Sequence, residues 1–404
     1  MRILYHHRTL GDGAEGIHVR EMVNAFRELG HEVKVVGPVG EKTPTASGKA
    51  KVLERIKKSL PSIAYECLEI LYTGYCFLRT SMEIRRFNPD LIYDRYIIFN
   101  AGNILAAKFH RLPLCLEVNA PLAYERATEP DEQLILKTLA RKMERWISAN
   151  STRTIVVSTP LLDYLESIGV PRGHCIVMPN GVNPKRFTPR EKDAGLLREL
   201  GIGDNRIVIG FSGVIRAWHG LDLLVEAIAD LAARQIPVFL LVVGDGPYRA
   251  ALEEMVERLK LHGSFAITGR IPHERVPDYV ALFDIAVSPR ATFYASPMKV
   301  IEYMAVGKPV VVPRTQNFLD MIDDGVNGST FPDGDKTGLA QALADLCHDP
   351  EKRRAIGANA AQKVLTRLNW RWNAEEVCRL FSTTETVDRR PSASDRRGMT
   401  NEDR

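Results

Sequence analysis

The chain has 404 residues, of which 45% are hydrophobic and 26% charged, and its formal net charge is +4. This composition is typical of globular proteins, and the length predicts two domains. The small net charge, together with the lack of a basic stripe interleaved with aromatic residues, argues against nucleic acid as a partner. The six cysteines show no metal-ligand spacing and favour a reducing, cytoplasmic compartment.

A predicted strand at 2–6 leads into a glycine loop that reads GDGAEG from Gly11 to Gly16. The spacing matches the G-x-G-x-x-G of dinucleotide-binding proteins. Two features argue against a nicotinamide cofactor. The segment His7–Leu10 lengthens the loop, and Gly37 stands at the end of the second strand, where an acidic ribose ligand is expected. We therefore predict a glycine loop whose amides, at the start of an amphipathic helix, can meet an anion or a sugar.

The segment 42–60, which follows the second strand, combines cationic side chains with apolar residues at helix-like spacing. Such a segment can lie on an anionic membrane surface, and a solvated loop is the alternative. The cationic residues are Lys42, Lys49, Lys51, Arg55, Lys57 and Lys58. The apolar stretch 61–78 carries Glu66 and Glu69, so it is not expected to span a membrane. The N-terminus has no signal-peptide pattern, so we expect a cytoplasmic protein, with a peripheral position at the inner membrane face as the second expectation.

Short apolar runs alternate with helix-length amphipathic segments along nearly the whole chain, which predicts parallel sheets built from βαβ units. In the first half, strands are predicted at 2–6, 32–36, 91–93, 114–118, 154–157 and 175–178. In the second half, they are predicted at 207–211, 238–243, 265–267, 285–287 and 309–312. Turn formers from Pro179 to Asn183 place a domain boundary between the halves. The predicted fold class is α/β, with two doubly wound parallel-sheet domains facing a central cleft.

The densest chemical signal is ASPMKVIEYMAVGKPVVV, from 295 to 312. Ser296 is a good N-cap and Pro297 suits the first helical position, so a helix is expected to begin here. Its free amides at Met298 and Lys299, and the lysine charge, would favour an anion. Glu302 could accept hydrogen bonds from sugar hydroxyls. An ordinary capped helix with a solvated glutamate is the alternative.

Several segments in order along the chain resemble the retaining glycosyltransferases of family 4, which have the two-domain GT-B fold. They include GIHVREMVNAFRELGHEVKVV, VMPNGVNPKRF, FSGVIRAWHGLDLLVEAI, LVVGDGPYRAALEE, ITGRIPHERVPDYVALFDIAVSP, SPMKVIEYMAVGKPVV and DDGVNGSTFPDGD. The resemblance implies transfer of a sugar from a nucleotide diphosphate donor, a UDP- or GDP-sugar, to an acceptor hydroxyl with retention. It implies no cofactor and no required metal, and it places the donor on the C-terminal domain.

The resemblance also implies domain roles. It makes residues 1–182 the acceptor-side domain and 183–367 the nucleotide-sugar domain. It makes 368–382 a closing helix that returns to the first domain, so that Trp370, Trp372 or Phe381 should touch residues before Asn183. The segment 383–404 has almost no apolar residues and is expected to be a disordered tail.

Donor-side residues follow from matching positions. Glu302 matches the second glutamate of the family's E-x7-E motif, which holds the ribose, whereas Tyr294 occupies the place of the first. Val214 and His219 replace the family's usual basic pair near Gly213, and Arg216 between them is the better candidate for a diphosphate ligand. The remaining donor-side candidates are Gly16, Gly244, Gly246, Gly269, Ile271, Ser296 and Met298.

On the acceptor side, the resemblance points to Gly13, Arg95, Glu117 and Asn119. Arg95 and Asn119 stand where the family often has histidines. Asn119 can hydrogen-bond but cannot act as a base at neutral pH, so no general base is assigned. A strand end that satisfies its own loop is the alternative for Glu117 and Asn119.

The implied reaction develops positive charge on the sugar ring and negative charge on the leaving diphosphate, so the main task is to stabilise the diphosphate. Arg216, Lys299 and the amide of Met298 can do this without a metal. Asp333-Gly334-Asp335, the one D-x-D in the sequence, is interpreted as a helix cap rather than a metal site. A lipid-linked or saccharide acceptor is expected. Two alternatives are a sugar-nucleotide epimerase on the same fold and a non-catalytic sugar-nucleotide-binding partner.

Overall fold

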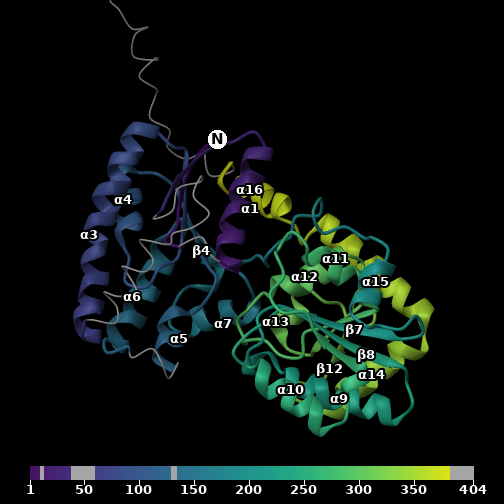
Figure 1. The fold of residues 1–404 in the computed structure, drawn as a ribbon. Helices are drawn as coiled ribbons and strands as arrows, with labels where there is room; N and C mark the ends of the chain where they lie inside the picture. The colour runs from purple at the N-terminus through teal and green to yellow at the C-terminus, as the bar shows by residue number, and fades with distance from the viewer. Residues whose placement is uncertain (10–12, 38–59, 129–133, 383–404) are drawn as a thin grey trace, which may run out of the picture.

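The computed structural model describes residues 1–9, 13–37, 60–128 and 134–382 (Figure 1). Most of the basic segment 42–60 and the whole of the tail 383–404 lie outside these ranges. Within the described ranges, no helix combines the length and the apolar character needed to cross a membrane.

The first sheet has six parallel strands in the order β2-β1-β3-β4-β5-β6. The strands are β1 Arg2–His6, β2 Glu32–Val36, β3 Leu91–Arg95, β4 Leu114–Val118, β5 Arg153–Val156 and β6 Cys175–Val177. All six were predicted from the sequence to within two residues. The apolar runs that predicted them are buried because helices cover both faces of a parallel sheet.

Alternate side chains of the first sheet enter two different cores. Ile3 and Tyr5 of β1 pack with α1 and α16, whereas Leu4 packs on the opposite side with α3, α4 and α6. The helices of this half are α1 Ala14–Glu28, α3 Ser62–Phe87, α4 Gly102–His110, α5 Leu122–Thr128, α6 Lys137–Asn150 and α7 Thr159–Ser167, with the 3-10 helix η1 at Arg172–His174. In Figure 1, α3, α4 and α6 form the outer layer of the molecule on this side.

The second sheet also has six parallel strands, in the order β12-β11-β10-β7-β8-β9. They are β7 Ile207–Ser212, β8 Val238–Val243, β9 Phe265–Ile267, β10 Ile285–Val287, β11 Val310–Pro313 and β12 Ser329–Phe331. The edge strand β12 was not predicted, because of its three residues only Phe331 is buried. Such a short segment has no readable hydrophobic period.

Helices surround the second sheet on both faces. They are α8 Ala194–Glu199, α9 Leu221–Ala233, α10 Arg249–Arg258, α11 Val276–Ala281, α12 Met298–Ala305, α13 Gln316–Leu319, α14 Lys336–His348 and α15 Pro350–Thr366, with 3-10 helices η2 Ala217–His219 and η3 His262–Ser264. Val208 of β7 enters the core that contains α12, and Ile209 enters the core on the other face with α9 and α14.

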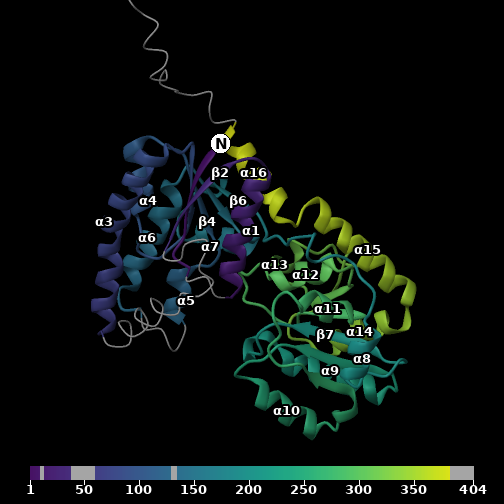
Figure 2. The same ribbon diagram turned by 45° about the horizontal axis from the view of Figure 1, so that its top comes forward.

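The last described helix, α16 Trp370–Ser382, returns to the first sheet and packs beside α1 (Figure 2). The indole ring of Trp370 lies 4.6 Å from the imidazole ring of His18, and Phe381 joins the core beneath α1. The predicted contact of this helix with residues before Asn183 is therefore confirmed. A close approach at Gly181 accompanies it, since a Cβ there would lie 2.5 Å from the amide nitrogen of Trp370.

The carboxyl edges of the two sheets face each other, because the loops that follow their strands are hydrogen-bonded together. The Ser158 hydroxyl, after β5, donates to the carbonyl of Tyr294 at 2.7 Å. The amide of Asn180, after β6, donates to the Ser296 hydroxyl at 3.0 Å. The amide of Thr159 donates to Asp320 at 2.6 Å. Ligands of doubly wound sheets bind at this edge, so both edges contribute to one candidate site.

Candidate active site

Two glycine loops that lie far apart in the sequence form one surface at the edge of the second sheet. A Cβ on Gly244 would lie 2.0 Å from the carbonyl oxygen of Gly213, and one on Gly246 would lie 2.3 Å from that of Ile215. The amide of Gly213 donates to the Val243 carbonyl at 2.9 Å and ties the two loops together. Because no side chain fits between the loops, glycine is required for their close approach.

Lys299, in the first turn of α12, points into this surface. Its ammonium lies 4.2 Å from the centroid of the Phe211 ring and 3.4 Å from where a Cβ of Gly213 would stand. No hydrogen-bond acceptor meets this buried nitrogen in the part of the chain that the structure describes. Burial lowers the pKa of Lys299 to about 7, against the opposing charge of Glu302. A buried cation with no acceptor is costly, and an anion at this position would compensate it.

His219 stands beside the same surface as a neutral group. Its Nδ1–H donates to the carbonyl of Val214 at 2.7 Å, and its ring lies 5.5 Å from that of Phe211. Burial, and after it the neighbouring charge of Lys299, lower the pKa of His219 to about 4. The imidazole is therefore uncharged at neutral pH and leaves Lys299 as the buried cation of this surface.

Arg216 is on the same loop but is exposed. Its guanidinium lies over the indole ring of Trp218, 4.6 Å from the ring centroid. Stacking of this kind holds a guanidinium without consuming its hydrogen-bond donors. Arg216 thus presents its donors to solvent near Gly213, whereas Lys299 is enclosed.

The helix α12 begins one residue later than expected, and the predicted cap is wrong. Pro297 is the N-cap residue, and no side chain caps the helix. The hydroxyl of Ser296 instead accepts the amide of Asn180, since the linker from the first sheet passes at that point. The side chain of Met298 packs against the core under α1. The first turn of α12 thus lies where the two halves of the protein meet.

Glu302 is buried one turn beyond Lys299, with its Oε1 3.4 Å from Nε2 of His273. His273 is a residue that the sequence reasoning did not select. It lies in the quoted segment ITGRIPHERV, but nothing local indicates that it reaches a glutamate on another helix. Gly269, which precedes it, has φ +74°, a conformation that favours glycine.

The loop of Gly269 is joined to the glycine loops through Thr268. The Thr268 hydroxyl donates to the Gly269 carbonyl at 2.8 Å and accepts the Gly244 amide at 3.1 Å. Ile271 packs against the core beside α12. The structure therefore brings together Gly213, Gly244, Gly246, Gly269 and Lys299, and their roles in donor binding stay predictions.

Tyr294 is placed differently from the sequence expectation. Its side chain is buried in the core of the first sheet, and its hydroxyl donates to the carboxylate of Glu125 on α5. The adjacent Phe293 ring lies 5.6 Å from Tyr124, edge to face. Because the aromatic side chain gains more from this apolar core than from a polar pocket, Tyr294 links the two halves rather than lying beside Glu302.

At the edge of the first sheet, Nε2 of His18 lies 2.6 Å from Oε1 of Glu117, and both side chains are buried. Burial lowers the pKa of His18. Burial alone would raise the pKa of Glu117, but the imidazole of His18 and the guanidinium of Arg95 lower it overall. The pair is thus a carboxylate beside a neutral imidazole. His18 was missed because a histidine on the inner face of an amphipathic helix looks like a core residue in the sequence.

Three other predicted acceptor-side residues surround this pair. Arg95 donates to the carbonyl of Glu15 at 3.3 Å, in the first turn of α1. Gly13 is the N-cap residue of α1 with φ +79°, and Gly16 is buried within that helix. The side-chain nitrogen of Asn119 is buried and meets no acceptor among the described residues.

The D-x-D segment lies at a helix start, as predicted. Asp335 is the N-cap residue of α14, although its side chain makes no capping hydrogen bond. Across the described ranges, no group of three or more His, Cys, Asp or Glu side chains is arranged to hold a metal ion.

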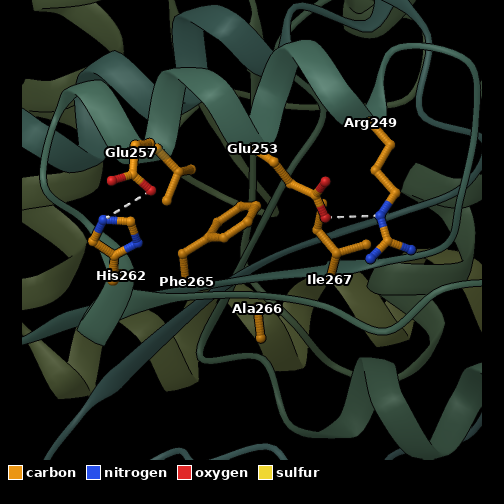
Figure 3. Close-up of a pocket in the computed structure, with 8 residues that line it drawn as sticks. Arg249, Glu253, Glu257, His262, Phe265, Ala266 and Ile267 are labelled. Carbon is orange, nitrogen blue, oxygen red and sulfur yellow. Dashed lines mark hydrogen bonds and ion pairs between the residues drawn. The ribbon is translucent and has the colours of Figure 1, made fainter.

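A separate shallow pocket lies between α10 and the edge strand β9 (Figure 3). Arg249 and Glu253 pair along α10 at 2.8 Å, and Glu257 and His262 lie 3.3 Å apart. Phe265 closes its floor. Because its charged groups satisfy one another, this pocket offers less to a ligand than the surface around Lys299.

Comparisons with known proteins agree with this geometry. Residues 15–186 match the model described as Glycosyltransferase Family 4, and residues 196–363 match Glycosyl transferases group 1. The chain is 29% identical over 212 residues to a GDP-mannose-dependent alpha-(1-6)-phosphatidylinositol monomannoside mannosyltransferase of Mycolicibacterium smegmatis, covering 51% of this chain and 55% of that protein. It is 25% identical to a GDP-mannose-dependent alpha-mannosyltransferase of Corynebacterium glutamicum, covering 86% of this chain and 80% of that one. The first of these alignments spans just over half of its relative's length.

Solved structures share the fold. Anabaena HepE in complex with UDP superposes with a TM-score of 0.72 at 19% identity, covering 95% of this chain and all of that one. Sucrose-phosphate synthase from Thermosynechococcus elongatus gives a TM-score of 0.70 at 20% identity, with 96% of this chain covered and all of the other. At these identities the likeness establishes the fold alone.

Two parallel doubly wound sheets whose carboxyl edges face each other define the GT-B architecture. The matches to both family models cover the two halves in turn. The chain belongs to the glycosyltransferases of the GT-B type.

Proposed function

We propose that this protein transfers a sugar from a nucleotide diphosphate donor, a UDP- or GDP-sugar, to an acceptor hydroxyl with retention at the anomeric carbon. The observation that carries this proposal is the buried ammonium of Lys299, which meets no acceptor within the described residues and is enclosed by the Gly213 and Gly244 loops. A diphosphate supplies the missing charge, and glycine loops let it approach the backbone.

The proposed mechanism places most of the catalytic effect on the leaving group. As the bond between the anomeric carbon and the diphosphate breaks, Lys299 and the amides that begin α12 stabilise the growing negative charge. Arg216 can swing from Trp218 to the outer phosphate, because its stack leaves the donors free. Glu302 and His273 hold the ribose of the donor. These cations and amides can replace a metal, so we propose that transfer is metal-independent.

The acceptor oxygen forms the new bond to the anomeric carbon and must lose a proton. Asn119 cannot take it, since an amide is not a base at neutral pH. A leaving phosphate oxygen is an available proton acceptor on the same face of the sugar. We therefore assign Asn119, Glu117 and Arg95 to positioning the acceptor rather than to general base catalysis.

Two classes of acceptor are proposed, a lipid-linked alcohol and a free saccharide. The mycobacterial relative is named for a phosphatidylinositol mannoside, which supports the first choice. In either case the products belong to glycolipid or polysaccharide synthesis.

Thermal denaturation against a panel of UDP- and GDP-sugars tests the donor site. A ligand at about 100 times its dissociation constant adds roughly 2.7 kcal/mol to the free energy of unfolding. We expect one nucleotide class to stabilise the wild type and to have little effect on Lys299→Met. If no nucleotide sugar stabilises the protein, the donor site is wrongly assigned.

Release of nucleotide diphosphate from the stabilising donor then separates the alternatives. A transferase releases the nucleotide slowly in water and faster with an acceptor, whereas a binding-only protein releases none. An epimerase would convert the donor into another nucleotide sugar without releasing the nucleotide. Activity that disappears on treatment with a chelator and returns with a divalent cation would contradict metal independence.

A further inference from the structure

The long helix α3 exposes a face that is entirely uncharged from Ile63 to Met82. The exposed positions on this stretch are Ile63, Cys67, Leu68, Leu71, Gly74, Tyr75, Leu78 and Met82. Leu71 is 70% exposed and Leu78 is 62% exposed. From Leu68 to Met82 the large apolar members recur at spacings of three and four residues, so they form one stripe along the helix.

Two neighbouring helices continue this apolar surface. Phe109 of α4 is exposed, and its ring lies 6.0 Å from that of Phe77 on α3. Lys108 of α4 lies over the exposed ring of Trp146 on α6, 5.5 Å from its centroid. The three helices form one layer on the side of the first sheet that faces away from α1 (Figures 1 and 2).

Exposed apolar side chains are concentrated in this layer. Of the seventeen large hydrophobic residues that are exposed in the described ranges, eleven lie on α3, on α4, or on α6 and the residue Ile135 before it. Scattered exposed apolar residues need no explanation, but a continuous patch of this size marks an interaction surface. We call these eleven residues the outer apolar patch. They are Ile63, Leu68, Leu71, Tyr75, Leu78, Met82, Leu105, Phe109, Ile135, Leu139 and Trp146.

Every exposed charged residue on these three helices is cationic. They are Arg85, Arg86, Lys108, Lys137, Arg141, Lys142 and Arg145. Of the acidic residues on the same helices, Glu66, Glu69 and Glu144 are buried, and Glu83 is partly buried and paired with Lys34. Glu66 is fully buried and accepts the amides of Ile135 and Leu136 at 2.6 and 2.7 Å, and Glu69 is buried against Arg126 at 2.7 Å.

A helix on the outer side of the second sheet has a different surface. On α10 the exposed charged residues are Glu253, Glu254, Glu257 and Arg258. Soluble surfaces normally mix both signs of charge, as solubility favours. The combination of apolar and exclusively cationic side chains is therefore a property of the α3, α4 and α6 layer.

We propose that the outer apolar patch and its surrounding cations dock the protein on an anionic lipid surface. Apolar side chains enter the interface between headgroups and acyl chains, while the cations at its rim meet lipid phosphates. A second copy of the chain fits this surface poorly, because a symmetric contact would bring two sets of like charges together. The surface lies outside the donor site, so the proposal does not depend on the transfer reaction.

Vesicle sedimentation of the full-length protein tests the proposal, with phosphatidylcholine vesicles compared with vesicles that also contain phosphatidylglycerol. The charge variant changes Arg86, Lys137, Arg141 and Lys142 to Gln. The matched control changes the exposed residues Arg258, Lys352, Arg354 and Arg367 of the second half to Gln. Both variants lose the same net charge, so a difference between them reports the position of the charge.

We expect the wild type and the matched control to bind anionic vesicles and to be released by salt. Each cation near an anionic surface strengthens binding about fivefold, so the charge variant, which loses four cations, should bind about 600-fold more weakly. Leu71→Ser with Leu78→Ser should also weaken binding, by roughly tenfold or more. Unchanged melting temperatures would show that these exposed substitutions preserve the fold.

Three results would overturn the proposal. One is a wild type that stays in the supernatant with anionic vesicles at low salt. The second is equal weakening in the charge variant and the matched control. The third is a wild-type dimer in sedimentation velocity that Leu71→Ser with Leu78→Ser converts to a monomer, without vesicle binding, which would make the patch an interface between copies.

Discussion

At the carboxyl edge of the first sheet Glu117 is paired with His18, whereas at the same edge of the second sheet Lys299 meets no acceptor among the described residues. The two sheets have the same strand number and the same parallel pattern. The two edges differ in whether a buried charged side chain has a partner nearby. At the first edge the Glu117 carboxylate has the His18 imidazole and the Arg95 guanidinium as neighbours, whereas at the second edge the Lys299 ammonium lacks an acceptor within the described ranges, which an anion would supply. This contrast supports our proposal that the diphosphate binds at the second sheet and the acceptor at the first.

The largest expected effect is on the free energy of unfolding, and it tests the buried pair of His18 and Glu117 at the first edge. His18→Ala leaves the Glu117 carboxylate buried without its imidazole partner, and it removes a ring that packs on Trp370. The unpartnered buried carboxylate and the cavity beside Trp370 together should cost about 3 kcal/mol or more, which urea denaturation measures. Adding Glu117→Gln to His18→Ala should recover part of the loss, because no charge then remains. No recovery would mean that packing, not the pair, determines the cost.

Lys299→Met tests the second edge, where the buried ammonium meets no acceptor among the described residues. We expect kcat to fall by about 100-fold to 1,000-fold, the scale for losing one preorganised charge stabiliser. The free energy of unfolding should not fall, because an unpaired buried charge is removed.

Lys308 provides the matched control for Lys299. Lys308 is partly buried, and its ammonium donates to the Ala281 carbonyl at 2.6 Å. Lys308→Met should lower stability by about 1 to 3 kcal/mol and spare kcat. If both variants behave alike, the contrast between a satisfied and an unsatisfied lysine is wrong.

Arg216→Ala tests the proposal that Arg216 acts on turnover, whereas Glu302 acts on donor binding. Arg216 faces charge that grows as the donor bond breaks, so turnover should fall by about 100-fold with little change in KM. Steady-state kinetics with the donor found by thermal denaturation measures both constants. A raised KM with normal kcat would make Arg216 a binding residue only.

Glu302→Ala should act mainly on donor binding. Hydrogen bonds from ribose hydroxyls to a carboxylate are made in the ground state and the transition state alike, so KM should rise by about 10-fold or more at similar kcat. Binding of the free nucleotide, measured by calorimetry, should weaken in parallel. Small and equal effects of Arg216→Ala and Glu302→Ala would show that one or both residues are wrongly placed in the site.

The smallest expected effect is a pH dependence. Burial lowers the pKa of Lys299 to about 7 in the free protein, below its ordinary value of 10.5. Between these two values the unfolded chain binds more protons than the folded one, so the Lys299 contribution to stability increases as pH rises through this window. Binding of a diphosphate favours the charged amine, so nucleotide binding above pH 7 should take up a proton.

Calorimetry in buffers of different ionisation enthalpy measures this proton uptake. Lys299→Met should abolish it, while Lys308→Met should leave it unchanged. Equal uptake in wild type and Lys299→Met would assign the proton to another group and would remove the electrostatic contrast between the two edges.

The sequence located most of the fold because local patterns determine most of it. Eleven of the twelve strands were predicted, since each is an apolar run bounded by turn residues. Tyr294 shows the limit of matching by position. The family resemblance put it at the place of a donor-binding glutamate, but its ring is buried in the first sheet's core and its hydroxyl donates to Glu125 on α5. No local feature of the sequence around Tyr294 reports a partner on a different domain.

Ser296 was misassigned for a related reason. A serine before a proline is a good N-cap by local chemistry, but its hydroxyl is taken by the Asn180 amide from the first half of the chain. The same holds for His18, whose position on α1 was predicted but whose carboxylate partner was not.

The sequence by itself determined the strands, the glycine loops and the helix that carries Lys299 and Glu302. These features depend on residues that lie close together in the chain. The tertiary structure decided which charges are satisfied. It places His18 beside Glu117 and the ammonium of Lys299 beside the ring of Phe211. It also buries Glu66 and Glu69 of α3, while the apolar stripe of that helix is exposed. Each of these outcomes depends on burial and on partners far away in sequence, and both are fixed only when the helices pack on their sheets.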